Sequence, residues 1–427
     1  MSRGERSLHS QIPLRRFIRE IADGPFGSSL TSSHYSDSGA RVVRLGNIGP
    51  ARFKDGDAAF ISMEYFNDLR RHEVKPGDLL IAGLGDENHS VGRACVAPNN
   101  LGPAIVKADC FRVRLDQSRL LHTYAAWALS SAVVSGQVLT LTRGSTRARI
   151  NLEVARDIQL PVPPLEEQRR IADFLDAETA RIDRLDRHDQ KLLGLLGERR
   201  KAVIDHEVNA ASRSLTKLFW KLSVLRDGTH QPPSRVDSGV PLLTARNVSG
   251  GELRLTDLDT HVSEEDAKLL EKSLRMMAGD VLLSVKGTIG ACAVAPAGFP
   301  RSVLDRNVAL LRPLPEYSSE WLSFVLRSTG LQDQMRISVT AAAQPGLPLG
   351  VIRELRVPDM PLTEQEGRVD RISARCQEID QVIDRVKRKG SLLSERRQAL
   401  INAAVTGQFD VSTASGRNVT DGVTAQP

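Results

Sequence analysis

Two stretches of the chain carry apolar residues at every third or fourth position, which is the spacing of one face of an α-helix. One stretch spans residues 369–400, and a weaker one spans residues 175–203. A seam of this period that persists over several turns is typical of helices that pack together as a coiled coil. The pattern therefore predicts two long helices, one in each half of the chain. The seam positions include Leu175 and Ile182 in the first helix and Ile379 and Ile383 in the second.

Outside these stretches the pattern changes to short apolar runs bounded by glycine, aspartate and proline. Examples are "VKPGDLLIAGLG" (74–85) and "MMAGDVLLSVKG" (276–287). Such runs are typical of strands and hairpins. The most apolar segment, "YAAWALSSAVVSGQVL" (124–139), is shorter than a membrane span and rich in serine. We expect it to form a buried core helix, and we expect no membrane role.

The chain consists of two copies of one unit, which is a feature to establish before any fold is assigned. "LPVPPLEEQRRIADFLD" (160–176) returns as "VPDMPLTEQEGRVDRIS" (357–373), with Gln168 and Gln365 lying 197 positions apart. The offset varies within the β-rich regions and is constant along the helices, so the insertions belong to loops. Proline is tolerated at the edge of a helix, so the prolines mark where each helix begins. The predicted segments are a first β-rich domain at 12–165, a first helix at 166–212, a second β-rich domain at 213–362, a second helix at 363–409 and a disordered tail at 410–427.

The charge and cysteine content narrow the choice of partner and compartment. The formal net charge is +6, which suits a polyanion such as nucleic acid without requiring one. The four cysteines are scattered, with no Cys-x-x-Cys pair, so neither a zinc site nor a disulfide framework is predicted. The first residues contain no apolar core of the kind found in signal peptides. We expect a reducing, cytoplasmic location.

No motif for catalysis stands out in the sequence. The phosphate-binding Gly-x-x-x-x-Gly-Lys-Ser/Thr loop, the dinucleotide-binding Gly-x-Gly-x-x-Gly pattern and the His-Glu-x-x-His zinc motif are missing. "HEVK" (72–75) ends in the Glu-x-Lys of many nuclease sites, but no Pro-Asp precedes it at a suitable distance. We therefore predict no catalytic residue and no metal ligand, and we disfavour a self-contained nuclease.

These features together resemble the specificity subunit of type I restriction-modification systems. The resemblance covers residues 12–409 and is carried by "PPLEEQRRIADFLD" (163–176) and "ERRQALINAAVTGQFDV" (395–411). The second copy departs from the pattern at Met360, which replaces the first proline of the pair. The resemblance implies an α+β fold in which two pseudo-twofold-related, β-rich target recognition domains are separated by two long antiparallel coiled-coil helices.

The resemblance also implies a function. Each recognition domain would read one half of a bipartite, asymmetric sequence in double-stranded DNA, and two methyltransferase subunits would dock on the assembly, with restriction subunits possible as well. The chain itself would be a non-catalytic subunit that binds no cofactor, while S-adenosylmethionine, ATP and Mg would belong to the partner subunits. A helix of roughly 40 residues spans about 60 Å, enough to separate two half-sites by one to two DNA turns of about 34 Å each.

Base readout in the major groove uses arginine, lysine, asparagine and glutamine on exposed loops. Any single candidate could instead be a solvated surface charge, and Asn47 and Asn247 could serve turn geometry. The DNA-binding candidates are Arg41, Arg44, Asn47, Arg52, Lys54, Arg143, Arg147, Arg149, Arg235, Arg246, Asn247, Lys286 and Arg306. The candidates for partner contact or helix packing are Glu167, Gln168, Leu175, Ile182, Arg199, Arg200, Glu364, Gln365, Ile379, Ile383, Arg396 and Arg397.

The rival interpretation is a coiled-coil scaffold that binds no DNA. It accounts for the helices but gives no role to the duplicated β-rich domains or to their basic loops. Within the favoured interpretation, an orphan specificity subunit that serves methyltransferases encoded elsewhere is also compatible with the sequence.

Overall fold

The computed structural model of the chain describes residues 9–86, 89–142, 148–211, 214–229, 233–340 and 346–411. They form two compact units: unit 1 comprises the described residues up to His188 and those from Arg388 onward, and unit 2 runs from Asp189 to Lys387. Each unit contains one β-rich domain and part of both long helices, α5 (Leu165–Ala211) and α10 (Leu362–Thr406). Most of the predicted tail, from residue 412, lies outside the described residues.

Unit 1 is built on two small sheets. A four-stranded antiparallel sheet has the order β10-β9-β12-β2, and a five-stranded sheet has the order β3-β7-β4-β11-β8, in which β4 and β11 run parallel. Two further strand pairs, β1 with β13 and β5 with β6, complete the domain. The strands are β1 Gln11–Pro13, β2 Ile18–Ala22, β3 Tyr35–Ser36, β4 Ala40–Val43, β5 Ile48–Gly49, β6 Arg52–Phe53, β7 Phe60–Ile61, β8 Glu73–Val74, β9 Leu79–Ala82, β10 Ala94–Val96, β11 Ala104–Val106, β12 Cys110–Leu115 and β13 Gln159–Pro161.

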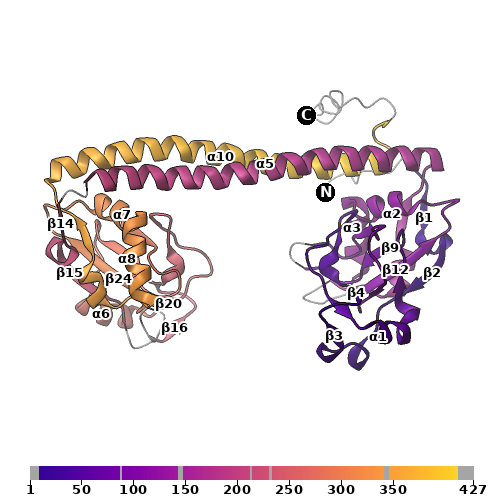
Figure 1. Cartoon of the computed structure of the whole chain (residues 1–427), viewed down its shortest axis with the longest axis horizontal. Helices are drawn as coiled ribbons and strands as arrows, with labels where there is room; N and C mark the ends of the chain where they lie inside the picture. Colours follow the sequence, from indigo (N-terminus) through magenta and orange to yellow (C-terminus); the bar gives the residue numbers. More distant parts are fainter. Residues whose placement is uncertain are drawn as a thin grey trace. The chain divides into compact units, whose positions relative to one another are not determined.

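Strand β9 shows why the apolar runs in the sequence are continuous rather than alternating. Leu79 and Ile81 point into a core shared with α2 (His122–Leu129) and α3 (Ala132–Leu141), whereas Leu80 and Ala82 point into a second core on the opposite face. A strand buried on both faces needs apolar side chains at every position. Figure 1 shows α2 and α3 beside β9 and β12, while α1 (Met63–Asp68) and α4 (Leu152–Asp157) are short.

The apolar segment 124–139 is buried as predicted, but it forms two helices instead of one. Helices α2 and α3 meet at an angle of 67°. The break lies at a serine pair: the Ser131 hydroxyl accepts a hydrogen bond from the Val134 backbone N–H and caps α3, while the Ser130 hydroxyl bonds to Ala94 of β10. Among the described residues, no single helix is both long and apolar enough to cross a membrane.

Unit 2 repeats the architecture of unit 1. Its main sheet has the order β15-β24-β21-β22, which matches β2-β12-β9-β10, and its second sheet has the order β16-β20-β17-β23. Helices α7 (Ser319–Arg327) and α8 (Thr329–Thr340) correspond to α2 and α3 and lie against the main sheet (Figure 1). The remaining elements are β14 Leu215–Lys217, β15 Leu222–Asp227, β16 Arg235–Val236, β17 Val240–Leu243, β18 Val248–Ser249, β19 Glu252–Leu253, β20 His261–Val262, α6 Glu264–Ser273, β21 Val281–Ser284, β22 Cys292–Val294, β23 Val303–Leu304, β24 Val308–Pro313, α9 Leu349–Glu354 and β25 Arg356–Pro358.

Within each unit the two long helices pack antiparallel. In unit 1, the first turns of α5 lie against the last turns of α10, and the Phe174 ring lies 5.3 Å from that of Phe409, just beyond α10. In unit 2, the end of α5 packs on the start of α10, where Ile204 and Ile372 share one apolar core. The predicted fold class, two β-rich domains with two long paired helices, is confirmed.

Candidate nucleic-acid interface

Four loop segments meet at one end of the main sheet in unit 1. The Gly83 N–H donates to the Asp109 carbonyl (2.7 Å), and the Ile150 N–H donates to the Gly83 carbonyl (2.9 Å). The loop after β9 therefore lies between the β11–β12 turn and the segment that follows residue 147. Arg149 pairs with Asp109 at 2.8 Å and projects from this set of loops. We call residues 23–26, 83–86, 107–109 and 148–150 the unit 1 loop cluster.

Unit 2 builds the same arrangement from different residues. The Val285 N–H donates to the Asn307 carbonyl, and the Leu347 N–H donates to the Val285 carbonyl, both at 2.9 Å. Lys286 and Arg306 are exposed and directly adjoin these bonded positions. The unit 2 loop cluster comprises residues 227–229, 285–288, 305–307 and 346–347. The same pair of backbone hydrogen bonds therefore holds the loop cluster together in both units.

Each loop cluster contains an Asp-Gly pair, and a larger residue in place of its glycine would collide with the neighbouring backbone. A Cβ on Gly24 would lie 2.1 Å from the Lys107 backbone, and a Cβ on Gly228 would lie 2.1 Å from the Leu304 carbonyl oxygen. Contacts that short are not tolerated, so both glycines allow the chain to pass closely over the β11 or β23 end. The repeated Asp-Gly of the sequence is explained by this crossing.

Asp23 is half-buried beside Asp109, and its carboxylate accepts a hydrogen bond from the Gly24 N–H (2.7 Å). Burial raises the pKa of Asp23 to about 6, and the nearby Asp109 carboxylate adds to the shift. A carboxylate held away from its usual pKa is more common at functional sites than elsewhere.

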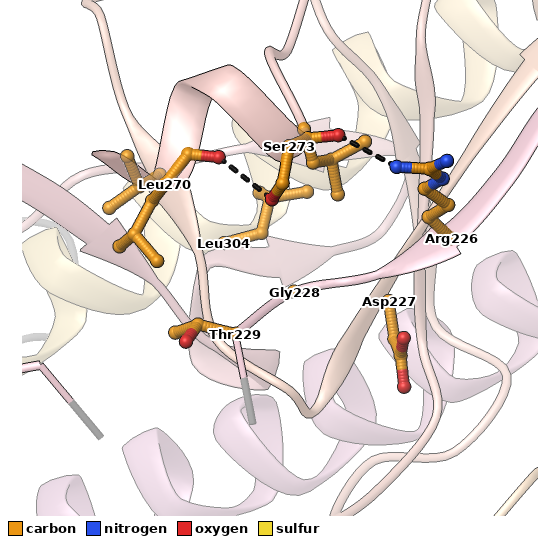
Figure 2. A pocket seen from close by; sticks show the side chains of 9 residues that line it. Arg226, Asp227, Gly228, Thr229, Leu270, Ser273 and Leu304 are labelled. Carbon is orange, nitrogen blue, oxygen red and sulfur yellow. Dashed lines mark hydrogen bonds between the residues drawn. The ribbon is translucent and has the colours of Figure 1, made fainter. Parts of the chain in front are cut away.

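A cavity of about 370 Å³ borders the loop cluster of unit 2 (Figure 2). Arg226 donates to the Ser273 carbonyl (2.9 Å) across this cavity, and the Ser273 hydroxyl donates to the Leu270 carbonyl (3.0 Å). Arg226 thus satisfies the C-terminal end of α6, where backbone carbonyls lack helical partners. The cavity wall at this point is formed by α6, and Asp227, Gly228 and Thr229 of the loop cluster line the cavity as well.

Two of the predicted DNA-binding arginines are engaged within unit 1. Arg41 is 8% exposed, forms an ion pair with Asp55 at 3.1 Å and donates to the Asp57 carbonyl. Arg44 forms an ion pair with the Asp57 side chain. Both arginines brace the loop at 55–57 and lie outside the loop cluster.

The two predicted asparagines hold turns. The Asn47 amide oxygen accepts from the Arg44 N–H (2.9 Å), and its nitrogen donates to the Lys54 carbonyl (2.8 Å). Asn247 makes the same pair of bonds to Thr244 (2.7 Å) and to Arg254 (3.0 Å). Both side chains are buried, so the structure shows the turn geometry that the sequence left as the alternative.

The other cations predicted to bind DNA lie at several different positions in the two units. Lys54 lies 3.4 Å from His89, beside the loop after β9, whereas Arg52 reaches Asp183 on α5. Arg235 and Arg246 are exposed on β16 and on the turn before β18. Arg143 and Arg147 lie outside the described residues. Of the predicted DNA-binding cations, Arg149 therefore lies in the unit 1 loop cluster, and Lys286 and Arg306 lie in the unit 2 loop cluster.

Two residues of the unit 1 loop cluster were not predicted from the sequence. Lys107 sits in the β11–β12 turn with its ammonium 5.7 Å from the Tyr35 ring centre, and Asp109 carries Arg149. Aligning the repeat through the β11–β12 turn would have placed Lys107 opposite Asp305, one residue before Arg306. This alignment would have pointed to Lys107, but it requires the register between the two turns, which only the structure supplies.

The predicted packing residues Gln168 and Gln365 make equivalent hydrogen bonds in the two units. The Gln168 amide oxygen accepts from the Leu121 N–H (2.9 Å), and its nitrogen donates to the carbonyls of Arg119 (3.0 Å) and Pro163 (2.9 Å). Gln365 bonds in the same way to Ser318 (2.8 Å), Glu316 (3.1 Å) and Met360 (2.9 Å). Both glutamines are fully buried and fasten the start of a long helix to the loop before α2 or α7.

The second arginine of each Glu-Arg-Arg string joins the two long helices. Arg397 of α10 pairs with Asp183 of α5 at 2.5 Å in unit 1, and Arg200 of α5 pairs with Asp380 of α10 at 3.3 Å in unit 2. Of the other predicted packing residues, three are buried, namely Leu175, Ile182 and Ile379. Ile383 and Arg396 are half-buried, and Arg199 is exposed. Glu167 lies 3.6 Å from His9, and Glu364 pairs with Arg368 at 2.9 Å.

Comparison with known proteins gives one consistent result. Residues 54–192 match the family described as the type I restriction modification DNA specificity domain. The chain is 23% identical to the specificity subunit of the type I restriction enzyme EcoBI from Escherichia coli, over 94% of this chain and 87% of that protein. It is 19% identical to the putative MjaX specificity subunit of Methanocaldococcus jannaschii, over 94% of this chain and 96% of that one.

Solved structures share the fold. A chain from a structure concerned with complex assembly and conformational transition of the type I R-M system superposes with a TM-score of 0.71 at 16% identity, covering 95% of this chain and all of that one. The crystal structure of the HsdS subunit from Thermoanaerobacter tengcongensis gives a TM-score of 0.51 at 16% identity, covering 94% of this chain and 97% of that one.

Proposed function

Because the chain belongs to the family of type I restriction-modification specificity subunits, we propose that its two β-rich domains each read one half of a bipartite, asymmetric sequence in double-stranded DNA. The observation that supports this most directly is the recurrence of one loop cluster, built at the same end of two sheets with the same strand order. Two domains of one architecture with different exposed side chains would recognise two different half-sites.

The chemistry of the loop clusters suits DNA. Lys286 and Arg306 in unit 2 and Arg149 in unit 1 offer charged donors, which contact phosphates and the acceptor-rich edge of guanine. The loops differ in length between the units, since the loop after β9 contains the Asp86–His89 pair whereas the segment after β21 is shorter. Loop variation on a fixed scaffold is how one fold acquires different binding preferences.

We further propose that two methyltransferase subunits, and restriction subunits where the system has them, assemble on this chain. Gln168 and Gln365 fix the two helix starts in the same way, so the exposed positions around them would present two similar surfaces to two copies of one partner. Catalysis would then belong to those partners. S-adenosylmethionine would be bound by the methyltransferase, which extrudes the target base to reach it, and ATP with Mg would be bound by the restriction subunit.

A paired-charge variant in unit 2 tests the assignment of the loop cluster. Replacing Lys286 and Arg306 by glutamine removes two positive charges from this cluster, and each lost base or phosphate contact costs about tenfold or more in binding. We expect methylation directed by the complex to fall, or its preference to relax, at one half-site while the other half-site keeps its sequence. The measurement is the methylated motif in cells that express the chain with its methyltransferase.

The control removes two cations at the other end of β15. Lys217 pairs with Glu354, and Arg353 lies over the Phe219 ring, so the variant that changes both to glutamine alters the same net charge away from the loop cluster. It should leave both half-sites unchanged. Equal effects of the two double variants would mean that general charge, and not the loop cluster, governs the interaction.

A further inference from the structure

Asp183 of α5 holds two arginines at once. Its Oδ2 lies 2.5 Å from Arg52 Nη1, and its Oδ1 lies 2.5 Å from Arg397 Nη1. Arg52 belongs to the β-rich domain and Arg397 to α10, so one carboxylate joins the domain and both helices in unit 1. The Asp183 side chain is 19% exposed, which protects it from much of the solvent screening that weakens surface ion pairs. We call this set of three residues the Asp183 junction.

The β5–β6 hairpin that carries Arg52 is fixed to the rest of the domain. The Ala51 N–H donates to the Ala94 carbonyl (2.7 Å) and to the Ser130 hydroxyl (3.2 Å), so the hairpin moves with β10 and α2. Between the hairpin, α2 and the helices lies a cavity of about 300 Å³, lined in part by Trp127 and Asp183. Arg52 and Asp183 both line this cavity, so their ion pair joins the domain to α5 where apolar side chains do not fill the space.

Unit 2 contains the matching helix pair at the same repeat positions. Asp380 lies 197 positions after Asp183, and Arg200 lies 197 positions before Arg397. Arg200 Nη2 contacts Asp380 Oδ2 at 3.3 Å. The donor and the acceptor have exchanged helices, as a pseudo-twofold relation between the two copies requires.

The β-rich domain of unit 2 also has an arginine whose charge acts on this helix pair, but it comes from another position. The counterpart of Arg52 is Glu252, while the counterpart of Ser130 is Arg327 at the end of α7. The Arg327 guanidinium occupies the space beneath the β18–β19 hairpin, where a Cβ on Gly251 would lie 2.4 Å from its Nη1. Gly251 stands where unit 1 has Ala51, so the smaller residue makes room for the larger one.

The charge of Asp380 acts on Arg327. Burial lowers the pKa of the Arg327 guanidinium, and the charges of Arg200 and Asp380 act on it in opposite directions. We call Arg200, Arg327 and Asp380 the Asp380 junction. Unit 2 thus also has an interhelix Asp–Arg pair with an arginine of its β-rich domain nearby, but only in unit 1 does the domain arginine contact the aspartate directly.

We propose that Asp183 is a positioning residue that fixes the unit 1 recognition domain on the helix pair, so that the complex accepts only one separation between the two half-sites. This inference rests on the proposed function. A recognition domain that tilts on its helix pair would tolerate a target whose unread gap is one base pair longer or shorter. A charge-assisted pair with fixed geometry restricts that motion.

The test uses the full-length chain expressed with its adenine methyltransferase, and the readout is the gap length at every methylated adenine pair in the host DNA. In Asp183→Asn and Arg52→Gln, we expect methylation at sites with a gap one base pair too long or too short to rise about tenfold relative to correctly spaced sites. Both half-site sequences should stay unchanged. Asp186→Asn removes the same charge from an exposed position on α5 and should match the wild type.

Arg397→Gln separates positioning from general stability. It breaks only the contact between helices, so it should widen the gap tolerance less than Arg52→Gln, which breaks only the contact to the domain. Unchanged gap selectivity in Arg52→Gln, or a larger effect in Arg397→Gln, would overturn the inference. If Asp183→Asn fails to accumulate, Arg52→Gln alone decides, because its side chain is 62% exposed. A wild-type complex that methylates no split motif would instead overturn the proposed function.

Discussion

Replacing Gln168 by leucine is expected to destabilise unit 1 by about 3 kcal/mol, because three backbone groups lose their partner at a buried site. The Leu121 N–H and the carbonyls of Arg119 and Pro163 would be left without the amide that satisfies them. Leucine has nearly the same volume, so the loss reflects hydrogen bonding and not a cavity. Hydrogen exchange measured by mass spectrometry should show loss of protection around residues 119–129 and 165–176, with unit 2 unaffected.

Gln365→Leu provides the reciprocal experiment in unit 2. It should expose residues 316–325 and the first turns of α10 while leaving unit 1 protected. Gln190→Leu, at an exposed position of α5, should change the free energy of unfolding by less than about 0.5 kcal/mol. If Gln168→Leu were as mild as Gln190→Leu, the glutamine would not be what fastens the helix to the domain.

Replacing Glu207 by glutamine is the second substitution expected to have a large effect, again about 3 kcal/mol, because it breaks a buried ion cluster from one side. Glu207 is buried between the helices of unit 2, 3.2 Å from Arg368 Nη1 and 3.0 Å from Arg371 Nη2. The corresponding place in unit 1 is apolar, with Ile171 and Ala404 in the core. Only unit 2 should lose stability.

The effect should depend on pH in a defined direction. Burial acts to raise the pKa of Glu207, but the hydrogen bond from Arg371 and the charges of Arg371 and Arg368 outweigh it and hold the pKa below its ordinary value of 4.5. A folded-state pKa below the unfolded one stabilises the protein above the unfolded pKa, and this contribution is lost as the pH falls through the folded pKa. Denaturant unfolding should therefore show a constant difference between wild type and Glu207→Gln near neutral pH, shrinking below about pH 4.5.

Glu198→Gln serves as the matched control, since Glu198 is exposed on the same helix. It should show little loss of stability and no comparable pH dependence. A difference between wild type and Glu207→Gln that persisted unchanged to low pH would mean that side-chain packing, and not the ion cluster, accounts for the loss.

The sequence predicted the repeat, the two long helices and the glutamine at each helix start, because each depends on periodicity or on residues that recur at a fixed offset. It failed where the partner of a side chain lies far away in sequence. Arg41 and Arg52 looked alike as loop cations, yet one is buried against the 55–57 loop and the other pairs with Asp183 on α5. Nothing local to either arginine distinguishes these outcomes.

The segment 124–139 shows the same limit on a smaller scale. Its apolar content correctly indicated burial, but the bend at Ser130 and Ser131 depends on a hydroxyl that reaches β10 and on a cap that competes with helix continuation. Serine within a helical pattern is compatible with either outcome, so tertiary contacts decide which one occurs.

The central claim is that this chain supplies the choice of DNA sequence. The most direct test is to express it with its adenine methyltransferase subunit and to locate methylated adenines across the host DNA by single-molecule sequencing, with and without this chain. The account predicts a split motif with two different halves and one fixed gap, which disappears when this chain is omitted. The same methylation in its absence, or a stable complex with the methyltransferase that methylates no split motif, would contradict the account.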